Sequence, residues 1–235
     1  MSAEDKVITG EFKEMEDQTE EKEEIVTYAE QDKNMEDTDT PTIKANRIAR
    51  FEKVSFEEFL AAYTPIWVET QKIIKNVPAG ESFGYSQEEL VAQALEIWEG
   101  IELPKRSTKG SAGYDFFFPY GHTEIPAGAS LMIPTGIKAY IEPNWVLFEV
   151  PRSSFGMTYR IQFDNTIGII DSDYYNNPKN EGHIFVKITN DSRDGLTCIF
   201  ETQCKYCQGI FVPFGITYDD DVDTAREGGL GSTGA

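Results

Sequence analysis

The sequence predicts a mostly β protein, an antiparallel jelly-roll β-sandwich with a small helical insert near the N-terminus. Three observations support this fold class. From Ile101 onward the chain consists of short apolar runs broken by Gly and Pro, without a further helix signal, which is typical of β-sandwiches. Before Ile101, two Ser-x-x-Glu patterns each precede an apolar stripe at helical spacing, which predicts two helices. The length of 235 residues allows one core of ordinary size.

The first 44 residues are acidic and poor in aromatic side chains. Residues 1–43 hold 15 Asp or Glu and 4 Lys, a net charge of −11 out of −20 for the chain. Such a segment buries too little apolar surface to offset its ordering entropy, so we expect a disordered solvating tail, with a protein-binding tail as the alternative. The negative charge also argues against nucleic acid as a partner, because phosphate backbones bind clustered Lys and Arg.

Cysteine usage indicates a reducing, cytoplasmic compartment. The chain has three cysteines, no apolar N-terminal leader and no apolar run long enough to span a membrane. Cys204 and Cys207 form a C-x-x-C, which in other proteins is a redox pair or half of a metal site. Since no second pair follows and the chain has two histidines, we expect both to be strand residues.

A helical insert is expected over residues 55–100. Capping boxes begin at Ser55 and Ser86, Pro65 predicts a kink in the first helix, and Gly100 ends the second. The expected division of the chain is an acidic tail (1–44), the first core strand (45–54), the helical insert (55–100), the jelly-roll core (101–224) and a Gly-rich C-terminal arm (225–235).

The stretch Asp164–Lys187 is predicted to be a β-hairpin with chemistry at its bend. A β-branched run leads into a turn that holds two carboxylates and two tyrosines, and an alternating run follows. Including the two arms of this hairpin, strands are expected at Tyr114–Phe118, Ser130–Pro134, Ile137–Ile141, Trp145–Val150, Ile161–Phe163, Ile167–Ile170, His183–Thr189 and Gly209–Tyr218.

Four further stretches accompany the hairpin, and the five occur in a fixed order. They are KGSAGYDFF (Lys109–Phe117), PRSSFG (Pro151–Gly156), the hairpin, CQGIFVPF (Cys207–Phe214) and REGGLGSTG (Arg226–Gly234). As an ordered set they resemble the five motifs of the trimeric dUTPase family. The resemblance implies a distorted jelly-roll subunit, a homotrimer with shared active sites, and Mg²⁺-dependent hydrolysis of dUTP to dUMP and pyrophosphate.

The hairpin matches the family's catalytic motif. The resemblance implies that Asp171 activates the water that attacks the α-phosphorus, with Asp173 as the alternative base. Tyr174 matches the tyrosine that packs under the deoxyribose and excludes a 2′-hydroxyl.

The same motif implies a uracil site. Asn165 matches the asparagine that reads the base, together with backbone groups that run from Gly168 through Ile170 to Asp171. Hairpin N–H and C=O groups pair with the uracil edge as a neighbouring strand would, and Gly168 permits a close approach.

Other motif residues are expected around the phosphates. Asp115 matches the aspartate that supports Mg²⁺ through water. Arg152 and Ser153 match the phosphate-binding arginine and serine, and Gln208 matches the glutamine of the fourth motif. In that motif Lys205 stands close to where the family usually has an arginine.

The C-terminal arm is expected to close over the nucleotide. Arg226 matches the arginine that reaches the γ-phosphate, and Gly231 and Ser232 offer N–H and hydroxyl donors. Leu230 stands where the family usually has a phenylalanine stacked on uracil. A leucine covers the base but lacks a stacking energy of about 1–3 kcal/mol, which predicts weaker arm closure.

Two other functions fit parts of this pattern. A dCTP deaminase shares the trimeric jelly roll, but no residue clearly matches its glutamate base. A regulatory protein that uses the nucleotide site as a switch is supported by Leu230 and by the additional N-terminal hundred residues, which include the acidic tail and the insert as possible partner-binding elements. An extended form of this kind suits a bacterium or a phage-infected host cell.

Overall fold

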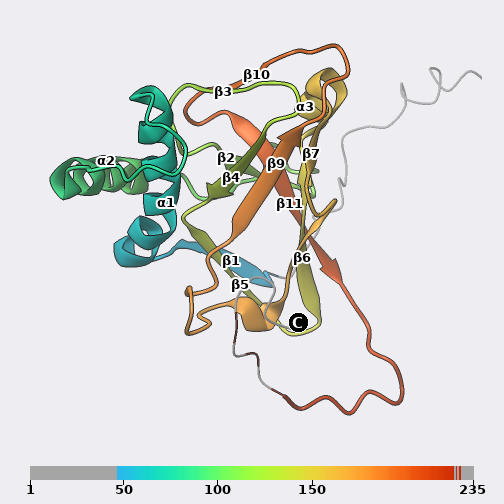
Figure 1. Ribbon diagram of the computed structural model, residues 1–235. Helices are drawn as coiled ribbons and strands as arrows, with labels where there is room; N and C mark the ends of the chain where they lie inside the picture. The colour runs from blue at the N-terminus through green and yellow to red at the C-terminus, as the bar shows by residue number, and fades with distance from the viewer. Residues whose placement is uncertain (1–46, 225, 227, 229–235) are drawn as a thin grey trace, which may run out of the picture. The chain divides into compact units, whose positions relative to one another are not determined.

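The computed structural model describes residues 47–224, 226 and 228 (Figure 1). The predicted acidic tail and most of the Gly-rich arm, including Leu230, Gly231 and Ser232, lie outside the described residues. None of the described helices is both long enough and apolar enough to cross a membrane.

The fold is mostly β and antiparallel, as the sequence predicts. A four-stranded sheet has the order β2-β11-β6-β8 and a three-stranded sheet has the order β4-β9-β7, while β1 pairs with β5 and β3 pairs with β10. The strands are β1 (Ala49–Lys53), β2 (Tyr114–Phe117), β3 (Thr123–Ile125), β4 (Ser130–Pro134), β5 (Ile137–Ile141), β6 (Trp145–Pro151), β7 (Ile161–Phe163), β8 (Gly168–Ile170), β9 (Phe185–Asn190), β10 (Cys198–Phe200) and β11 (Lys205–Pro213).

The two predicted helices form. They are α1 (Phe56–Ile74), which continues through Pro65, and α2 (Gln87–Gly100). The Ser55 hydroxyl accepts the N–H of Glu58 at 3.1 Å, as in a capping box. The returning bond is different from the prediction, because the N–H of Ser55 donates to Glu181, a residue far along the chain, instead of to Glu58.

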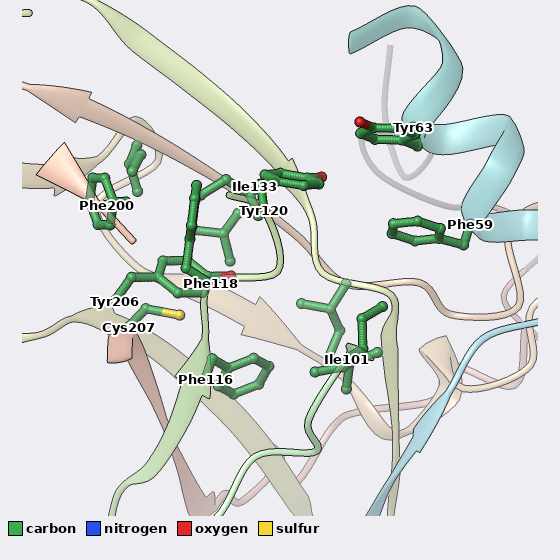
Figure 2. Close-up of a cluster of buried hydrophobic side chains, with 14 of the residues drawn as sticks. Phe59, Tyr63, Ile101, Phe116, Phe118, Tyr120, Ile133, Phe200, Tyr206 and Cys207 are labelled. Carbon is green, nitrogen blue, oxygen red and sulfur yellow. The ribbon is translucent and has the colours of Figure 1, made fainter. Parts of the chain in front are cut away.

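The insert shares the core of the β-sheets. Figure 2 shows Phe59 and Tyr63 on α1 directed toward side chains of the β region, including Tyr120. The Tyr63 and Tyr120 rings stack with their centroids 5.6 Å apart, and Phe59 is completely buried. Aromatic side chains of this size contribute strongly to core stability, so α1 is part of the folded unit.

The prediction that Asp164–Lys187 forms a β-hairpin is wrong, because its two strands do not pair with each other. β8 pairs with β6, while β9 pairs with β7 and β4, so the two arms lie in different sheets. A 3₁₀ turn at Ser172–Tyr174 and a loop carry the chain between the sheets. β-branching predicts that a run is a strand but does not select its partner.

Three short elements were not predicted. β3 and β10 have three residues each, which is too short for a periodic pattern. The prediction that no helix follows Ile101 is also wrong, because α3 spans Ser153–Tyr159. Its N-cap, Arg152, makes no capping hydrogen bond through its side chain, so the usual sequence signal is missing.

Cys207 is a strand residue as predicted, whereas Cys204 lies one residue before β11, so the prediction is wrong for Cys204. All three cysteines are free, and Cys207 is buried within β11. Burial raises the pKa of the Cys207 thiol well above its ordinary value, which disfavours the reactive thiolate.

Candidate active site

Three predicted site residues meet in one pocket through strand register. Asp115 on β2 lies directly opposite Gln208 on β11, and β11 also pairs with β6, which leads into Arg152. Together they line a cavity of about 280 Å³. We call it the Asp115 pocket, and its lining residues are Ser107, Ser111, Ala112, Gly113, Asp115, Arg152 and Gln208.

Two cations and a hydroxyl surround the buried carboxylate of Asp115. Lys205 Nζ lies 3.0 Å and Arg152 Nη1 3.6 Å from its oxygens, and the Ser107 hydroxyl donates at 2.7 Å. Burial raises the pKa of Asp115, but the hydrogen bonds from Ser107 and Lys205 and the charge of Arg152 outweigh it and leave the pKa lowered. Asp115 is therefore paired with one cation of the pocket lining, Arg152, and with a second beside it, Lys205, and this local excess of positive charge favours an anion.

Gly113 packs closely against the end of the Gln208 side chain. A Cβ on Gly113 would lie 2.5 Å from Oε1 of Gln208, so any larger residue would displace the glutamine side chain. Ser107 was missed by the sequence prediction. It reaches the pocket because Lys105 forms an isolated bridge with Asp115, a pairing that no local pattern indicates.

The second group of predicted residues forms the turn Asp171–Tyr174, which we call the Asp171 turn. It begins where β8 ends, and the side chains of Asp171 and Asp173 are both more than half exposed. Arg226 Nη1 lies 2.9 Å from Asp171 and 3.0 Å from Asp173, and its guanidinium lies 5.1 Å from the centroid of the Tyr174 ring. Arg226 is thus found on the Asp171 turn and not in the Asp115 pocket.

Tyr174 is buried and held at its hydroxyl. The hydroxyl donates to the carbonyl of His183 at 2.8 Å and accepts from the Asn180 amide at 2.8 Å. Burial raises its pKa, so the hydroxyl stays protonated at neutral pH. The ring position is therefore set by groups that follow it in the chain.

The remaining predicted residues differ in exposure. Asn165 is exposed in the turn between β7 and β8, and Ser153 is exposed as the first residue of α3. Gly168 and Ile170 are buried on β8, opposite Glu149 and Leu147 of β6. A Cβ on Gly168 would lie 3.0 Å from Glu149 atoms, which explains the glycine.

The two groups are separate within one chain. Among the described residues, no hydrogen bond or ion pair joins Asp171, Tyr174 or Arg226 to Asp115, Arg152 or Gln208. A larger cavity of about 450 Å³ between α2 and the loop after β2 contains none of the predicted site residues.

Sequence comparison assigns the family. The dUTPase family model matches residues 99–234, more than half of the chain. The chain belongs to the dUTPase family. Residues 47–98 precede the region matched by this dUTPase model, and they contain β1, α1 and all of α2 except its last two residues.

Individual dUTPases cover the same part of the chain. The deoxyuridine 5′-triphosphate nucleotidohydrolase of Lactococcus lactis is 41% identical over 138 residues, which are 58% of this chain and 90% of the relative. That of Salmonella arizonae is 34% identical over 145 residues, 59% of this chain and 90% of the relative. The crystal structure of dUTPase from Streptococcus mutans has 44% sequence identity, covers 51% of this chain and 90% of its own, and gives a TM-score of 0.44.

One buried acid of this dUTPase was missed by the sequence prediction. Glu149 on β6 is 1% exposed, and its Oε1 has no hydrogen-bond partner. Burial raises the pKa of Glu149 to about 8, so it is protonated at neutral pH. An acidic residue in an apolar strand is the available signal, but the pattern alone does not indicate that it faces the core.

The described residues contain no cluster of three or more His, Cys, Asp or Glu side chains able to hold a metal ion. Asp115 is the one acid among the residues that line the Asp115 pocket, and its carboxylate is already paired with cations. These residues fit an ion that keeps most of its water and phosphate ligands, as Mg²⁺ does, and not a metal held in a protein cage.

Proposed function

We propose that this protein hydrolyses dUTP to dUMP and pyrophosphate. Membership of the dUTPase family supports the activity, and the observation that carries it is the Asp115 pocket. Three separate motif stretches contribute Asp115, Arg152 and Gln208 to this one pocket, and Lys205 beside it is a second cation on the same carboxylate. A positively charged pocket with amide and hydroxyl donors suits a triphosphate, whose hydrolysis depends mainly on charge neutralisation and positioning.

The phosphate groups are proposed to bind Arg152, Ser153 and Gln208. The guanidinium of Arg152 offers a planar fork for phosphate oxygens, and Ser153 contributes an exposed hydroxyl at the start of α3. Asp115 would keep the Arg152 guanidinium oriented through their ion pair. On binding of nucleotide, Arg226 would leave the Asp171 turn and contact the γ-phosphate.

Asp171 is proposed as the base. Its carboxylate is half exposed and therefore accessible to water, and release of Arg226 would free it to accept a proton from the water that attacks the α-phosphorus. The Asn165 amide and the backbone from Gly168 to Ile170 are proposed to read uracil, and the ring of Tyr174 to support the deoxyribose.

Mg²⁺ is proposed to enter bound to the triphosphate. Asp115 would hold the hydrated ion through water, since Mg²⁺ keeps much of its hydration shell when it binds with a triphosphate. When bound, the ion would neutralise charge that develops on the phosphate oxygens.

A homotrimer with shared sites is proposed because the Asp115 pocket and the Asp171 turn are not joined within one chain. The face of the four-stranded sheet that bears Asp115 also carries Phe148 and its partner Ile169, which is 59% exposed. An exposed apolar sheet face of this kind suits contact with another subunit. Residues of the arm, including Leu230, Gly231 and Ser232, are proposed to complete a neighbouring site.

The direct test is turnover of a deoxynucleotide panel with Mg²⁺, assayed for pyrophosphate and ammonia. We expect pyrophosphate from dUTP, and a loss of about 10²–10⁴-fold in kcat for Asp171→Asn, the range for removal of a general base. Binding of dUTP should persist in this variant, because the amide is nearly isosteric with the carboxylate.

The matched control is Asp194→Asn, which removes an exposed acid in a loop outside both site groups. Its kcat should equal that of the wild type. Ammonia from dCTP would support a deaminase, and nucleotide binding without turnover would support a switch protein; either result would overturn the proposal. Undiminished turnover by Asp171→Asn would remove Asp171 from the role of base.

A further inference from the structure

The start of α1 is hydrogen-bonded directly to the loop that follows the Asp171 turn, residues 175–184. The backbone N–H and the hydroxyl of Ser55 both donate to Glu181, at 3.1 and 2.5 Å. Lys138 Nζ donates to the same carboxylate at 3.0 Å. Burial raises the pKa of Glu181, but the hydrogen bonds from Ser55 and Lys138 outweigh burial and leave the pKa lowered. The carboxylate is therefore ionised at neutral pH. The N-cap of α1 is therefore held by a charged group of the loop.

A second contact joins the same turn of helix to the end of the loop. Nδ1 of His183 lies 3.0 Å from Oε1 of Glu58, and Nε2 accepts the N–H of Gly136 at 2.8 Å. Because Nε2 accepts, the ring proton resides on Nδ1 and the imidazole is neutral. Burial lowers the pKa of His183 to about 3, in agreement with this state. The completely buried His183 ring thus links α1 to the β region.

Tyr174 is fixed by the same loop. Its hydroxyl donates to the His183 carbonyl and accepts from Asn180. Gly182 packs against the backbone of Tyr174. Its φ is 79°, and a Cβ at this position would lie 2.5 Å from the Tyr174 carbonyl oxygen. The loop has little freedom to shift unless its contacts with α1 are broken. A continuous set of bonds therefore runs from α1 through the loop to Tyr174.

The geometry points to the start of α1 as a positioning element for the sugar site. Ser55 and Glu58 are positioning residues that act through Glu181 and His183 to hold the Tyr174 ring where it excludes a 2′-hydroxyl. This inference rests on the proposed function, in which Tyr174 supports the deoxyribose. α1 precedes the part of the chain that the dUTPase model matches, so the contact joins the matched region to a helix outside it.

Selectivity is the property most sensitive to such positioning. A steric barrier to one hydroxyl group depends on sub-ångström placement of the ring, whereas contacts of the shared base and phosphates are the same for dUTP and UTP. Loss of the α1 contacts should therefore admit UTP more than it impairs dUTP.

The experiment compares kcat/KM for dUTP and UTP in the full chain and in single variants. We expect Glu58→Ala and Ser55→Ala to lower the dUTP-to-UTP ratio about tenfold, which corresponds to about 1.4 kcal/mol. Glu58→Gln keeps an oxygen that accepts from His183 and should retain the wild-type ratio. If Glu58→Ala does not fold, Ser55→Ala carries the test, with folding checked by its melting temperature.

The control is Glu57→Ala, which removes an exposed acid from the same turn of α1 and should leave the ratio unchanged. An equal fall of kcat/KM for both nucleotides, an unchanged ratio in folded variants, or the same fall in Glu57→Ala would overturn the positioning role. Absence of dUTP hydrolysis by the wild type would instead overturn the proposed function, and this inference with it.

Discussion

The Asp115 pocket and the Asp171 turn are held in place in different ways. In the pocket, antiparallel register sets the position of the side chains, since Gln208 lies opposite Asp115 and β11 also pairs with β6. In the turn, the backbone leaves β8 and joins no sheet until β9, and the position of Tyr174 depends on side chains of the following loop. One region is positioned by strand pairing and the other by a network of side chains.

The two regions also differ in charge. At the pocket, Arg152 of the lining and Lys205 beside it pair with one buried carboxylate, while the turn places one arginine between two exposed carboxylates. Charge of opposite sign in the two regions suits a substrate with an anionic end and a neutral end. The comparison predicts that variants of the pocket affect catalysis with little effect on stability, while variants around the turn affect both.

The largest effect is expected in the pocket. Arg152→Gln should lower kcat/KM for dUTP about 100-fold, because a charge-assisted, bidentate contact with phosphate contributes about 2–3 kcal/mol. Steady-state kinetics measure it. Arg160→Gln is the control, because Arg160 pairs with Asp191 on the surface and should leave kcat/KM unchanged. A tenfold smaller loss for Arg152→Gln would show that the pocket does not bind phosphate through this residue.

A smaller effect, on stability, is expected at Glu149, the buried acid of β6 that lies opposite Gly168 of β8. The pKa of Glu149 rises from 4.5 to about 8 on folding, so its contribution to stability is complete below pH 4.5 and is lost as the pH rises through about 8. Between pH 6 and 8 the loss should approach about 2 kcal/mol, at 1.36 kcal/mol per pH unit.

Urea unfolding of the wild type and of Glu149→Gln at pH 6, 7 and 8 tests this prediction. The glutamine variant has no titrating group at this position, so the difference in free energy of unfolding should shift in its favour as the pH rises. A difference that stays constant with pH would contradict the assigned protonation state.

The smallest effect is expected from one methyl group on β8. Gly168→Ala would place a Cβ 3.0 Å from Glu149, so the Glu149 side chain or β8 must move by a few tenths of an ångström, and we expect a cost of about 1–2 kcal/mol in the free energy of unfolding. KM for dUTP should rise with it if the β8 backbone reads uracil. Gly215→Ala, where a Cβ meets no atom within 4 Å, is the control for both measurements. An unchanged KM would separate β8 from base recognition.

Local sequence determined the types of the longer elements and the residues of the motifs, but not the short elements β3, β10 and α3. The strands at Ser130–Pro134, Ile137–Ile141 and Ile161–Phe163 have the predicted bounds, and the helices begin after Ser55 and Ser86 as predicted. These features depend on alternation, capping and turn residues, which act between neighbours in the chain. The ordered motifs likewise indicated the family before any fold was known.

Only the tertiary structure decided which segments meet. The strand that pairs with β8, the Glu181 carboxylate that binds the N-cap residue of α1, and the cations around Asp115 all come from distant parts of the chain. A strand pattern is the same whichever strand it pairs with, and a glutamate in a loop carries no local mark of the residue it contacts. Register and burial select these partners, because an unpaired buried polar group is costly and each contact must be satisfied within the whole fold.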